Sequence, residues 1–515
     1  MMKTIIRHII IYFIVLSVFY GCSGEQQHSE ETPPQSLINV IGKKDSDIFP
    51  IAFDRYQSLT SELPIGVFDS GIGGLTVLSE IVRLDNYNNV SHEPGSDGIP
   101  DFEVEHFVYL GDQANMPYGN YDSENKTEFL RELVIKDAVF LLGNRYWPSQ
   151  TAVSPIFDKP PVKAIVIACN TATAFGLEHV RESLIEWNIP IYIIGVVNAG
   201  ADGAIEALVE SGVDGNIAVM ATVGTCSSEG YVRAVDKSAQ DAAIITPQVT
   251  QQGCLGLAGA IERDASYITT ITDASENYQG PSIENQIAPI DTSLFALYSF
   301  ENSGIIRDKV DVNLIRLNSV ENYIRYHTTM LVENYRKTGN SKPIGTVILG
   351  CTHFPFYADR IEASFKRLRN FSYENGSKPY EHLIPEHISF IDPAQFTAVQ
   401  LYEELRDSGL LIEKPENSVI GTDEFYISIP HSATDIINLT ENGAFTYKFK
   451  YGRDEGNIDI EYVKRIPMSK RTLSPTVIQS ITETMPWIRE RLAEFNAESP
   501  RCSGIPESER IPFQL

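Results

Sequence analysis

Two short stretches of the chain end in the same way, and they constrain its fold more than any other feature. Residues 164–174 read AIVIACNTATA and residues 345–355 read GTVILGCTHFP. In each stretch a short, β-branched apolar run ends at a small residue and a cysteine, Cys169 or Cys351. Such runs are typical of buried strands, and the residues after them can begin a helix. We expect both thiols at strand ends beside helix N-termini, where the helix dipole favours the thiolate.

A third strand, Ile65 to Phe68, ends in the same kind of turn, where Asp69 and Ser70 precede a glycine-rich stretch that reaches Gly74. Ligands of open α/β sheets bind at the carboxyl ends of strands. The turn lacks the GxGxxG spacing of a dinucleotide site and the acidic residue about 20 positions later. Its glycines therefore indicate close approach of the backbone to a substrate carboxylate.

Apolar strands and helical stretches alternate along most of the chain, which is the signature of parallel sheets covered by helices. We predict an α/β fold with two mostly parallel-sheet lobes, an active site in the cleft between them, and a C-terminal extension. Lobe 1 spans residues 61–195 and is completed by 354–412, lobe 2 spans 196–353 with an insert at 263–318, and the extension spans 413–515. In the extension we expect strands at FYISI, FTYKFKY and IDIEYV and a helix around residues 477–495.

Charge and composition exclude some classes of partner. The chain has 515 residues and a formal net charge of −27, and it lacks the Lys and Arg clusters that neutralise phosphates, so we predict no binding to nucleic acid. An anionic substrate must then be bound locally, by backbone N–H groups and hydroxyls. An acidic turn within residues 86–105 weakly resembles a calcium loop but lacks the upstream ligands, so no metal site is predicted.

The first 22 residues have the pattern of an export signal, with Lys3 and Arg7 before an apolar run that ends near Tyr20. Gly21-Cys22 and the residues before it resemble a bacterial lipobox. That resemblance implies lipidation of Cys22, a tether over residues 23–60, and a membrane-anchored protein in the periplasm or at the outer membrane. An uncleaved anchor or a misassigned start remains an alternative, and a misread leader would leave the protein cytoplasmic.

The other cysteines show no CxxC spacing, which argues against zinc and thioredoxin-like sites; they are Cys169, Cys226, Cys254, Cys351 and Cys502. Their odd number in an exported chain predicts at least one free thiol. We interpret Cys226 and Cys502 as structural and Cys254 as a core residue.

Four motifs in order resemble the signatures of glutamate racemases: FDSGIGGL at 68–75, MPYG at 116–119, ACNTA at 168–172 and LGCTH at 349–353. The resemblance runs from about residue 63 to 405. It implies a racemase that needs no cofactor, metal or nucleotide and that supplies D-glutamate for cell-wall peptidoglycan. It also implies that the amino-acid substrate is bound by Ser70, Pro117, Tyr118, Gly119, Asn170, Thr171, Thr222, Thr225, Glu262 and Thr352.

The chemistry of the residues agrees with this resemblance. Inversion at Cα removes a proton from one face and delivers one to the other, which requires two acid–base groups on opposite sides of the substrate. Cysteine suits both tasks because its thiolate is a base and its thiol an acid. We predict Cys169 and Cys351 as this pair, with Asp69 polarising the first thiol and His353 the second.

Other functions stay open at this stage. The substrate could be aspartate or another acidic amino acid, although His353 stands where aspartate racemases typically carry an acidic residue. A lipoprotein that binds an amino acid without turnover is the alternative from another class. A Cys169–Cys351 disulfide could silence the enzyme outside the cytosol. The sequence also leaves a homodimer open.

Overall fold

The first sheet combines strands from both ends of the protein. In the computed structural model, which describes residues 47–264, 266–268, 278–307, 315–412, 422–432 and 436–512, six strands lie in the order β12-β11-β2-β1-β3-β4. Neighbouring strands are parallel except β11 and β12, which are antiparallel. The strands are β1 (Ile65–Asp69), β2 (Phe107–Gly111), β3 (Ala164–Ile167), β4 (Tyr192–Gly195), β11 (Glu424–Pro430) and β12 (Val463–Pro467).

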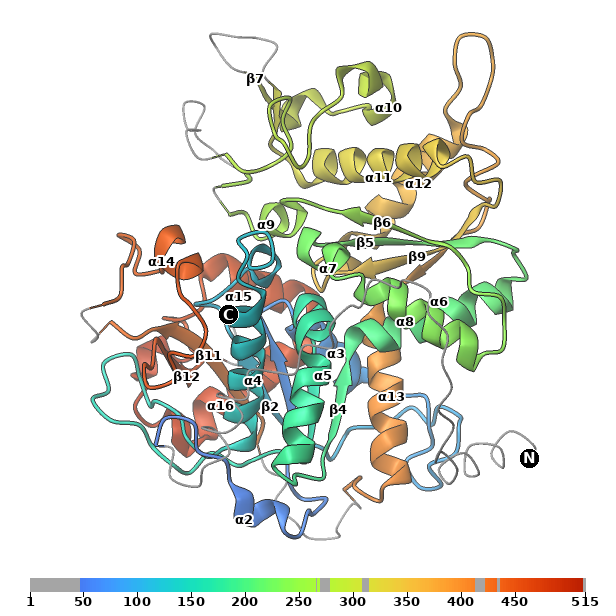
Figure 1. Cartoon of the computed structure of the whole chain (residues 1–515). Helices are drawn as coiled ribbons and strands as arrows, with labels where there is room; N and C mark the ends of the chain where they lie inside the picture. Colours follow the sequence, from blue (N-terminus) through green and yellow to red (C-terminus); the bar gives the residue numbers. More distant parts are fainter. Residues whose placement is uncertain are drawn as a thin grey trace, which may run out of the picture. The chain divides into compact units, whose positions relative to one another are not determined.

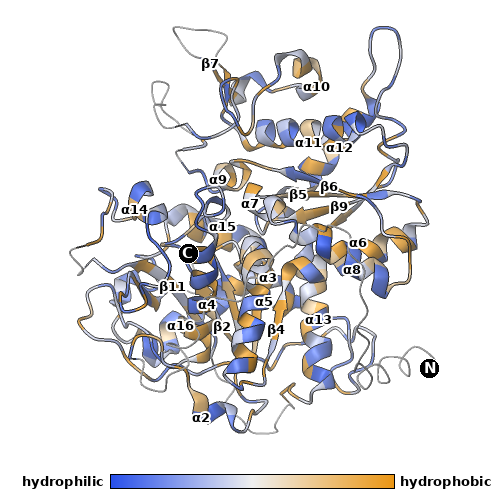
Figure 2. Ribbon diagram, viewed as in Figure 1, coloured by the Kyte–Doolittle hydropathy of each residue, from blue (hydrophilic) through white to orange (hydrophobic). Residues whose placement is uncertain are grey.

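The second sheet has four strands in the order β10-β9-β5-β6, all of them parallel. They are β5 (Asn216–Ala221), β6 (Val249–Gly253), β9 (Ile344–Gly350) and β10 (Ser389–Ile391). The predicted α/β class with two mostly parallel sheets is confirmed. A parallel strand that is covered on both faces has to be apolar along its whole length, and β1, β2, β3 and β9 are buried at every position. Figure 2 shows β2, β4 and β9 in hydrophobic colours.

Helices cover both faces of the first sheet (Figure 1). One face packs on α4 and α5 around Phe68 and Leu110, and the other packs on α3, α13 and α16 around Val67 and Tyr109. The longer helices are α3 (Leu75–Arg83), α4 (Thr127–Leu142), α5 (Asn170–Glu186), α6 (Val196–Ser211), α8 (Gly230–Asp241), α11 (Val320–Lys337), α12 (Ala358–Asn370), α13 (Pro393–Asp407), α15 (Pro475–Thr484) and α16 (Pro486–Glu498). The shorter elements are α2 (Phe53–Tyr56), α7 (Val223–Ser227), α9 (Leu257–Ile261), α10 (Phe295–Tyr298), α14 (Tyr447–Tyr451), β7 (Ile305–Arg307) and β8 (Ile315–Leu317).

Residues 354–412 do not all complete lobe 1, so this prediction is wrong in part. Helix α12 packs on α11, and β10 pairs with β9, which places both elements with the second sheet. Helix α13 contacts lobe 1, where it packs on α3, and it also packs on α6. The residues just after α13 contact lobe 1 as well, since Leu410 and Ile412 hydrogen-bond through their backbone to Lys163 and Glu105. The short strand β10 has no signal that would tell which sheet it joins, because register depends on the partner and not on the strand alone.

The C-terminal region is part of the first sheet and not an appendage to it. FYISI forms β11 as expected, but FTYKFKY contains the helix α14, and β12 begins only at Val463, the last residue of IDIEYV. The expected terminal helix is two helices, because Pro486 lacks the N–H that would continue α15 and instead begins α16. Helix α16 packs on β11 and α3.

The predicted tether is also too long. Residues 23–46 and the leader with Cys22 lie outside the described residues, but Phe49 and Tyr56 are buried in the core of lobe 1. The Tyr56 hydroxyl donates to the carbonyl oxygens of Leu142 and Val162. All described residues belong to one compact unit that spans Pro34–Leu515. Within those residues, no helix combines the length and the apolar character that a membrane span needs.

The two inserts differ in how they are held. In residues 86–105, Asp101 accepts hydrogen bonds from the backbone of Asn86 and Tyr87 at 2.7 and 3.1 Å, so its carboxylate closes the loop. Across the described residues, no group of three or more His, Cys, Asp or Glu side chains is placed to hold a metal ion. The insert at 263–318 packs on α11 through an aromatic cluster that includes Tyr298 and Tyr326, whose ring centroids are 5.5 Å apart.

The packing of the C-terminal region on the first sheet can be tested at Leu492 of α16, whose side chain is 1% exposed. We expect Leu492→Ala to lower the free energy of unfolding by about 2–5 kcal/mol, since a buried cavity replaces the side chain. Amide exchange in β2 should accelerate at the same time, because β11 and α16 cover that strand. Chemical denaturation and hydrogen exchange measure the two effects, and exposed Glu490→Ala is the control. Unchanged amide exchange in β2 would contradict the view that α16 and β11 protect this strand.

Candidate active site

A pocket lies where the carboxyl ends of the two sheets meet. It is lined by Asp69 at the end of β1, Cys169 after β3, Thr222 after β5 and Cys351 after β9. Parallel strands all end at the same edge of their sheet, so two sheets whose carboxyl edges face each other converge on one pocket. Both strand-end thiols therefore line the same space, although Cys351 lies 182 positions after Cys169 in the sequence.

Nearly all the predicted site residues of the described chain line this pocket; they are Asp69, Ser70, Pro117, Tyr118, Gly119, Cys169, Asn170, Thr171, Thr222, Glu262, Cys351, Thr352 and His353. Thr225 is the exception. It is fully buried, and its hydroxyl lies 3.0 Å from that of Thr171 and 2.9 Å from that of Thr222. It supports the pocket wall from behind and does not line it.

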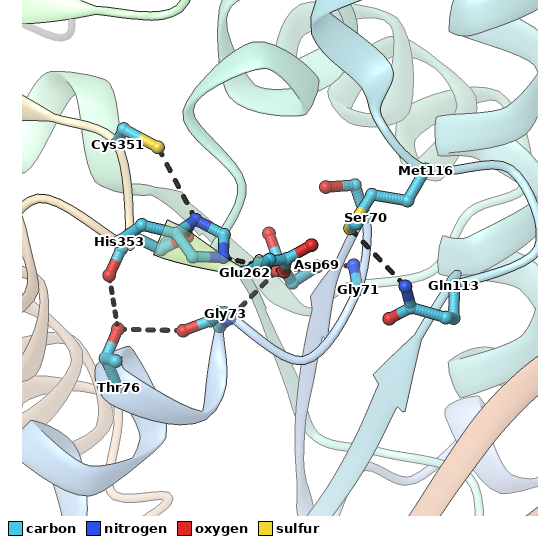
Figure 3. A network of polar contacts seen from close by, with 12 residues as sticks. Asp69, Ser70, Gly71, Gly73, Thr76, Gln113, Met116, Glu262, Cys351 and His353 are labelled. Carbon is cyan, nitrogen blue, oxygen red and sulfur yellow. Dashed lines mark hydrogen bonds and ion pairs between the residues drawn. The ribbon is translucent and has the colours of Figure 1, made fainter. Parts of the chain in front are cut away.

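Cys351 is the first member of a chain of three polar groups (Figure 3). Its sulfur lies 3.6 Å from Nδ1 of His353, and Nε2 of His353 lies 2.8 Å from a carboxylate oxygen of Glu262. Burial alone would lower the pKa of His353, but Glu262 and the contact with Cys351 raise it well above its usual value. His353 is then an imidazolium at neutral pH, and it donates to the sulfur and to Glu262.

The Glu262 carboxylate already has a partner within the protein, the imidazole of His353. The sequence predicted it as a substrate-binding residue, but its carboxylate is used by His353. The glycine-rich turn supports this arrangement from below. A Cβ atom on Gly73 would lie 2.6 Å from the hydroxyl oxygen of Thr352 and 2.7 Å from Cε1 of His353, so any larger residue would displace the imidazole.

Cys169 lies in a different electrostatic setting. Its sulfur accepts from the backbone N–H of Ala172 at 3.4 Å and donates to the hydroxyl of Ser70 at 3.7 Å. Burial and then the nearby Asp69 carboxylate raise the pKa of Cys169 to about 12, and the two hydrogen bonds only oppose this rise. Cys169 is therefore a neutral thiol at neutral pH.

The expectation that both sulfurs lie at helix N-termini is half right. Cys169 is the N-cap of α5, but α12 begins only at Ala358, after a turn that follows Cys351. The dipole also fails to favour the Cys169 thiolate, because desolvation outweighs it. Asp69 does not hydrogen-bond to Cys169: it accepts from the backbone of Gly71 at 3.3 Å and Gly74 at 2.8 Å. Burial raises the pKa of Asp69, and His353 and these N–H groups oppose the rise.

Hydroxyl groups join the two lobes on one side of the pocket. Thr171 of lobe 1 and Thr222 of lobe 2 place their hydroxyl oxygens 3.2 Å apart, and Thr225 completes a triangle with them. The Asn170 side chain is fixed by the hydroxyl of Tyr231, which donates to its amide oxygen at 2.6 Å. These side chains are held in place before any substrate binds, which favours orientation of a bound molecule.

The loop Met116–Asn120 forms another wall of the pocket. The hydroxyl of Tyr118 points away from the pocket and lies 2.5 Å from Asp112 and 2.7 Å from Asp137. One hydroxyl has one proton, so it can donate to only one of the two carboxylates. Burial and Asp112 raise the pKa of Asp137 to about 8, which lets protonated Asp137 donate to the tyrosine oxygen. What Tyr118 and Gly119 present to the pocket is mainly backbone.

Several pocket residues escaped the sequence analysis. Asp264, Tyr267 and Ile287 come from the insert at 263–318, and Asn120 follows the MPYG motif. Cys254, predicted as a core residue, is 3% exposed in the core of lobe 2 and also lines the pocket. Gly256 has a φ of +77°, and a Cβ at this position would lie 2.6 Å from the Tyr267 ring. A glycine at position 256 is therefore the sequence feature that could have pointed to this part of the pocket.

Known proteins similar to this chain include glutamate racemases. No family model matches the chain. A glutamate racemase of Pseudomonas syringae pv. tomato is 25% identical over 359 residues, which cover 70% of this chain and 84% of the relative. One of Levilactobacillus brevis is 27% identical over 348 residues, covering 68% and 80%.

Among solved structures, a glutamate racemase isoform of Bacillus anthracis has a TM-score of 0.42 at 24% identity, covering 71% of this chain and 88% of that one. The sequence matches extend over about two thirds of the chain and most of each relative. By its sequence, the chain is a homologue of the glutamate racemases.

Proposed function

We propose that this protein is a cofactor-independent racemase that interconverts L- and D-glutamate by proton transfer between two thiols. The observation that carries the proposal is that Cys169 and Cys351, from different sheets, line one pocket in opposite electrostatic settings. One sulfur contacts a buried imidazolium, and the other is a neutral thiol. In the proposed reaction the sulfur beside His353 acts as the base and the Cys169 thiol acts as the acid, as inversion at Cα requires.

The protons balance in a single turnover. The Cys351 thiolate, hydrogen-bonded to His353, takes the proton from one face of Cα, which breaks a C–H bond and forms an S–H bond. The Cys169 thiol gives its proton to the opposite face, which restores a C–H bond with inverted configuration. The sulfurs have then exchanged roles, and the site can act on the opposite enantiomer or return to its first form by proton exchange with water.

Backbone N–H groups and hydroxyls bind the substrate's charged groups. The amino end of α5 supplies N–H groups beside Cys169, and an anion at a helix N-terminus is stabilised by the dipole. The hydroxyls of Thr171 and Thr222 face the same pocket. The homologues support glutamate as the substrate, and aspartate or another acidic amino acid is the alternative.

The place of action is a separate proposal, which rests on the sequence of the leader. The protein is exported, cleaved before Cys22 and anchored by a lipid on that cysteine. Metabolic labelling of the full chain with a radioactive fatty acid tests this, with Cys22→Ala as the control. Labelling of wild type alone supports the anchor, whereas an unlabelled cytoplasmic protein contradicts it. A homodimer stays a prediction.

Proton exchange at Cα tests the reaction itself. In D₂O with reductant, the α-proton signal of both L- and D-glutamate should disappear in proton NMR spectra. Racemisation should fall by about 10²- to 10⁴-fold in Cys169→Ser and in Cys351→Ser, since each removes one of two acid–base groups. Cys226→Ser, outside the pocket lining, is the control. Binding without exchange would favour the amino-acid-binding lipoprotein, and exchange of aspartate alone would reassign the substrate.

The role of Glu262 predicts a particular pH dependence. Because its carboxylate raises the pKa of His353, Glu262→Gln should let the imidazole lose its proton at lower pH than in wild type. Racemisation by the variant should therefore fall more at pH 8 than at pH 6, by about tenfold for each pH unit above the new pKa. Measured kcat/KM at both pH values, with Glu490→Gln, an exposed residue outside the pocket lining, as the control, checks this. An equal loss at both pH values would rule out the assignment.

A further inference from the structure

The C-terminal region contacts the pocket loop Met116–Asn120 through a row of side chains on and just after α14. Lys450 donates from Nζ to the carbonyl oxygen of Met116. The Tyr451 hydroxyl donates to the carbonyl oxygen of Pro117 at 3.3 Å and accepts from the amide of Asn120 at 3.2 Å. Consecutive residues of α14 thus bind consecutive carbonyl groups of the loop, next to the backbone of Tyr118 and Gly119 that faces the pocket.

Arg453, which follows α14, holds this helix in a fixed position. Arg453 is 5% exposed and donates to the amide oxygen of Asn115 at 2.7 Å. Its guanidinium lies over several aromatic rings, with centroid distances of 4.9 Å to Phe129, 4.7 Å to Phe445, 5.6 Å to Phe449 and 5.3 Å to Tyr462. A buried cation enclosed by rings and paired with an amide has few other positions to occupy. Lys450 and Tyr451 are therefore presented to the loop from a fixed support.

We propose that Lys450 and Tyr451 are positioning residues, which hold the backbone of Met116 and Pro117 so that the next peptide groups face the substrate. This inference rests on the proposed racemase function. It assigns a task in substrate binding to a segment of the C-terminal region. Neither residue lines the pocket, so both act through the loop.

The charged Lys450 side chain lowers the stability of the fold, which supports a functional reason for a lysine at this position. Burial and then nearby Arg453 lower the pKa of Lys450 to about 8, and the carboxylates of Asp264 and Asp112 only partly oppose this. A lysine whose pKa is lower in the folded than in the unfolded state destabilises the fold while it is charged. This penalty is fully present below pH 8 and is relieved as the pH rises toward the unfolded value.

The loop has other anchors, so it should stay folded without these two contacts. Tyr118 remains bound to Asp112 and Asp137, and Gly119 packs against lobe 2, where a Cβ on Gly224 would lie 2.6 Å from the Gly119 carbonyl oxygen. Removing Lys450 or Tyr451 therefore releases one edge of the loop and leaves the rest in place.

Steady-state kinetics and thermal unfolding of Lys450→Met and Tyr451→Phe test the proposal. We expect KM for glutamate to rise about tenfold in Lys450→Met, below the ~100-fold that a misplacement of about 1 Å can cost, with kcat changed by less than about twofold. Its melting temperature should equal or exceed that of wild type, because the buried charge is gone. Lys448→Met, on the exposed side of the same helix, should match wild type. An unchanged KM, or a parallel loss of kcat and melting temperature, would overturn the proposal.

Hydrogen exchange separates this proposal from the proposed activity. Without substrate, amides of residues 115–121 should exchange faster in Lys450→Met and in Tyr451→Phe than in wild type and Lys448→Met. Faster exchange in these variants, together with a wild-type protein that does not racemise glutamate, would support the positioning role of Lys450 and Tyr451 and refute the proposed activity. Unchanged exchange in the variants of an enzyme that does racemise glutamate would refute the positioning role alone.

Discussion

The architecture depends on one constraint: in a parallel sheet all strands end at the same edge, so the residues after them share one place in space. Two such edges face each other in this protein, and the turns after β1, β3, β5 and β9 supply most of its chemistry. The turns are rich in small or polar residues because other groups approach their backbone closely, as the side chains of Thr352 and His353 approach Gly73. The packing of the helices on the two sheets keeps these two edges facing each other.

Similar local sequences give the two thiols different properties. Each cysteine ends a buried strand, but Cys169 faces a carboxylate and apolar surroundings, whereas Cys351 faces an imidazolium that Glu262 keeps protonated. The difference comes from the groups beside each sulfur, which are Asp69 for Cys169 and the His353–Glu262 pair for Cys351. Two thiols in unlike settings suit the proposed proton transfer, which must run in both directions.

The C-terminal region illustrates how far a local pattern can be trusted. FTYKFKY alternates apolar and polar residues as an exposed strand does, yet it contains α14, because its aromatic side chains pack around Arg453. VKRIP carries two charged residues and shows no strand signal, yet it forms β12, where Arg465 pairs with buried Asp137 at 2.9 Å. Arg453 and Arg465 each bind a partner more than 300 residues away along the chain, Asn115 and Asp137 respectively.

The sequence by itself determined the α/β class, the strands that carry the cysteines, and nearly all the side chains that line the pocket, because these follow from short apolar runs and the residues directly after them. Only the tertiary structure decided which groups pair. His353 meets Glu262 from 91 residues away, and Lys450 meets Met116 from 334 residues away. Desolvation likewise depends on what surrounds a group, so the neutral state of Cys169 could not be predicted from the helix start that it caps.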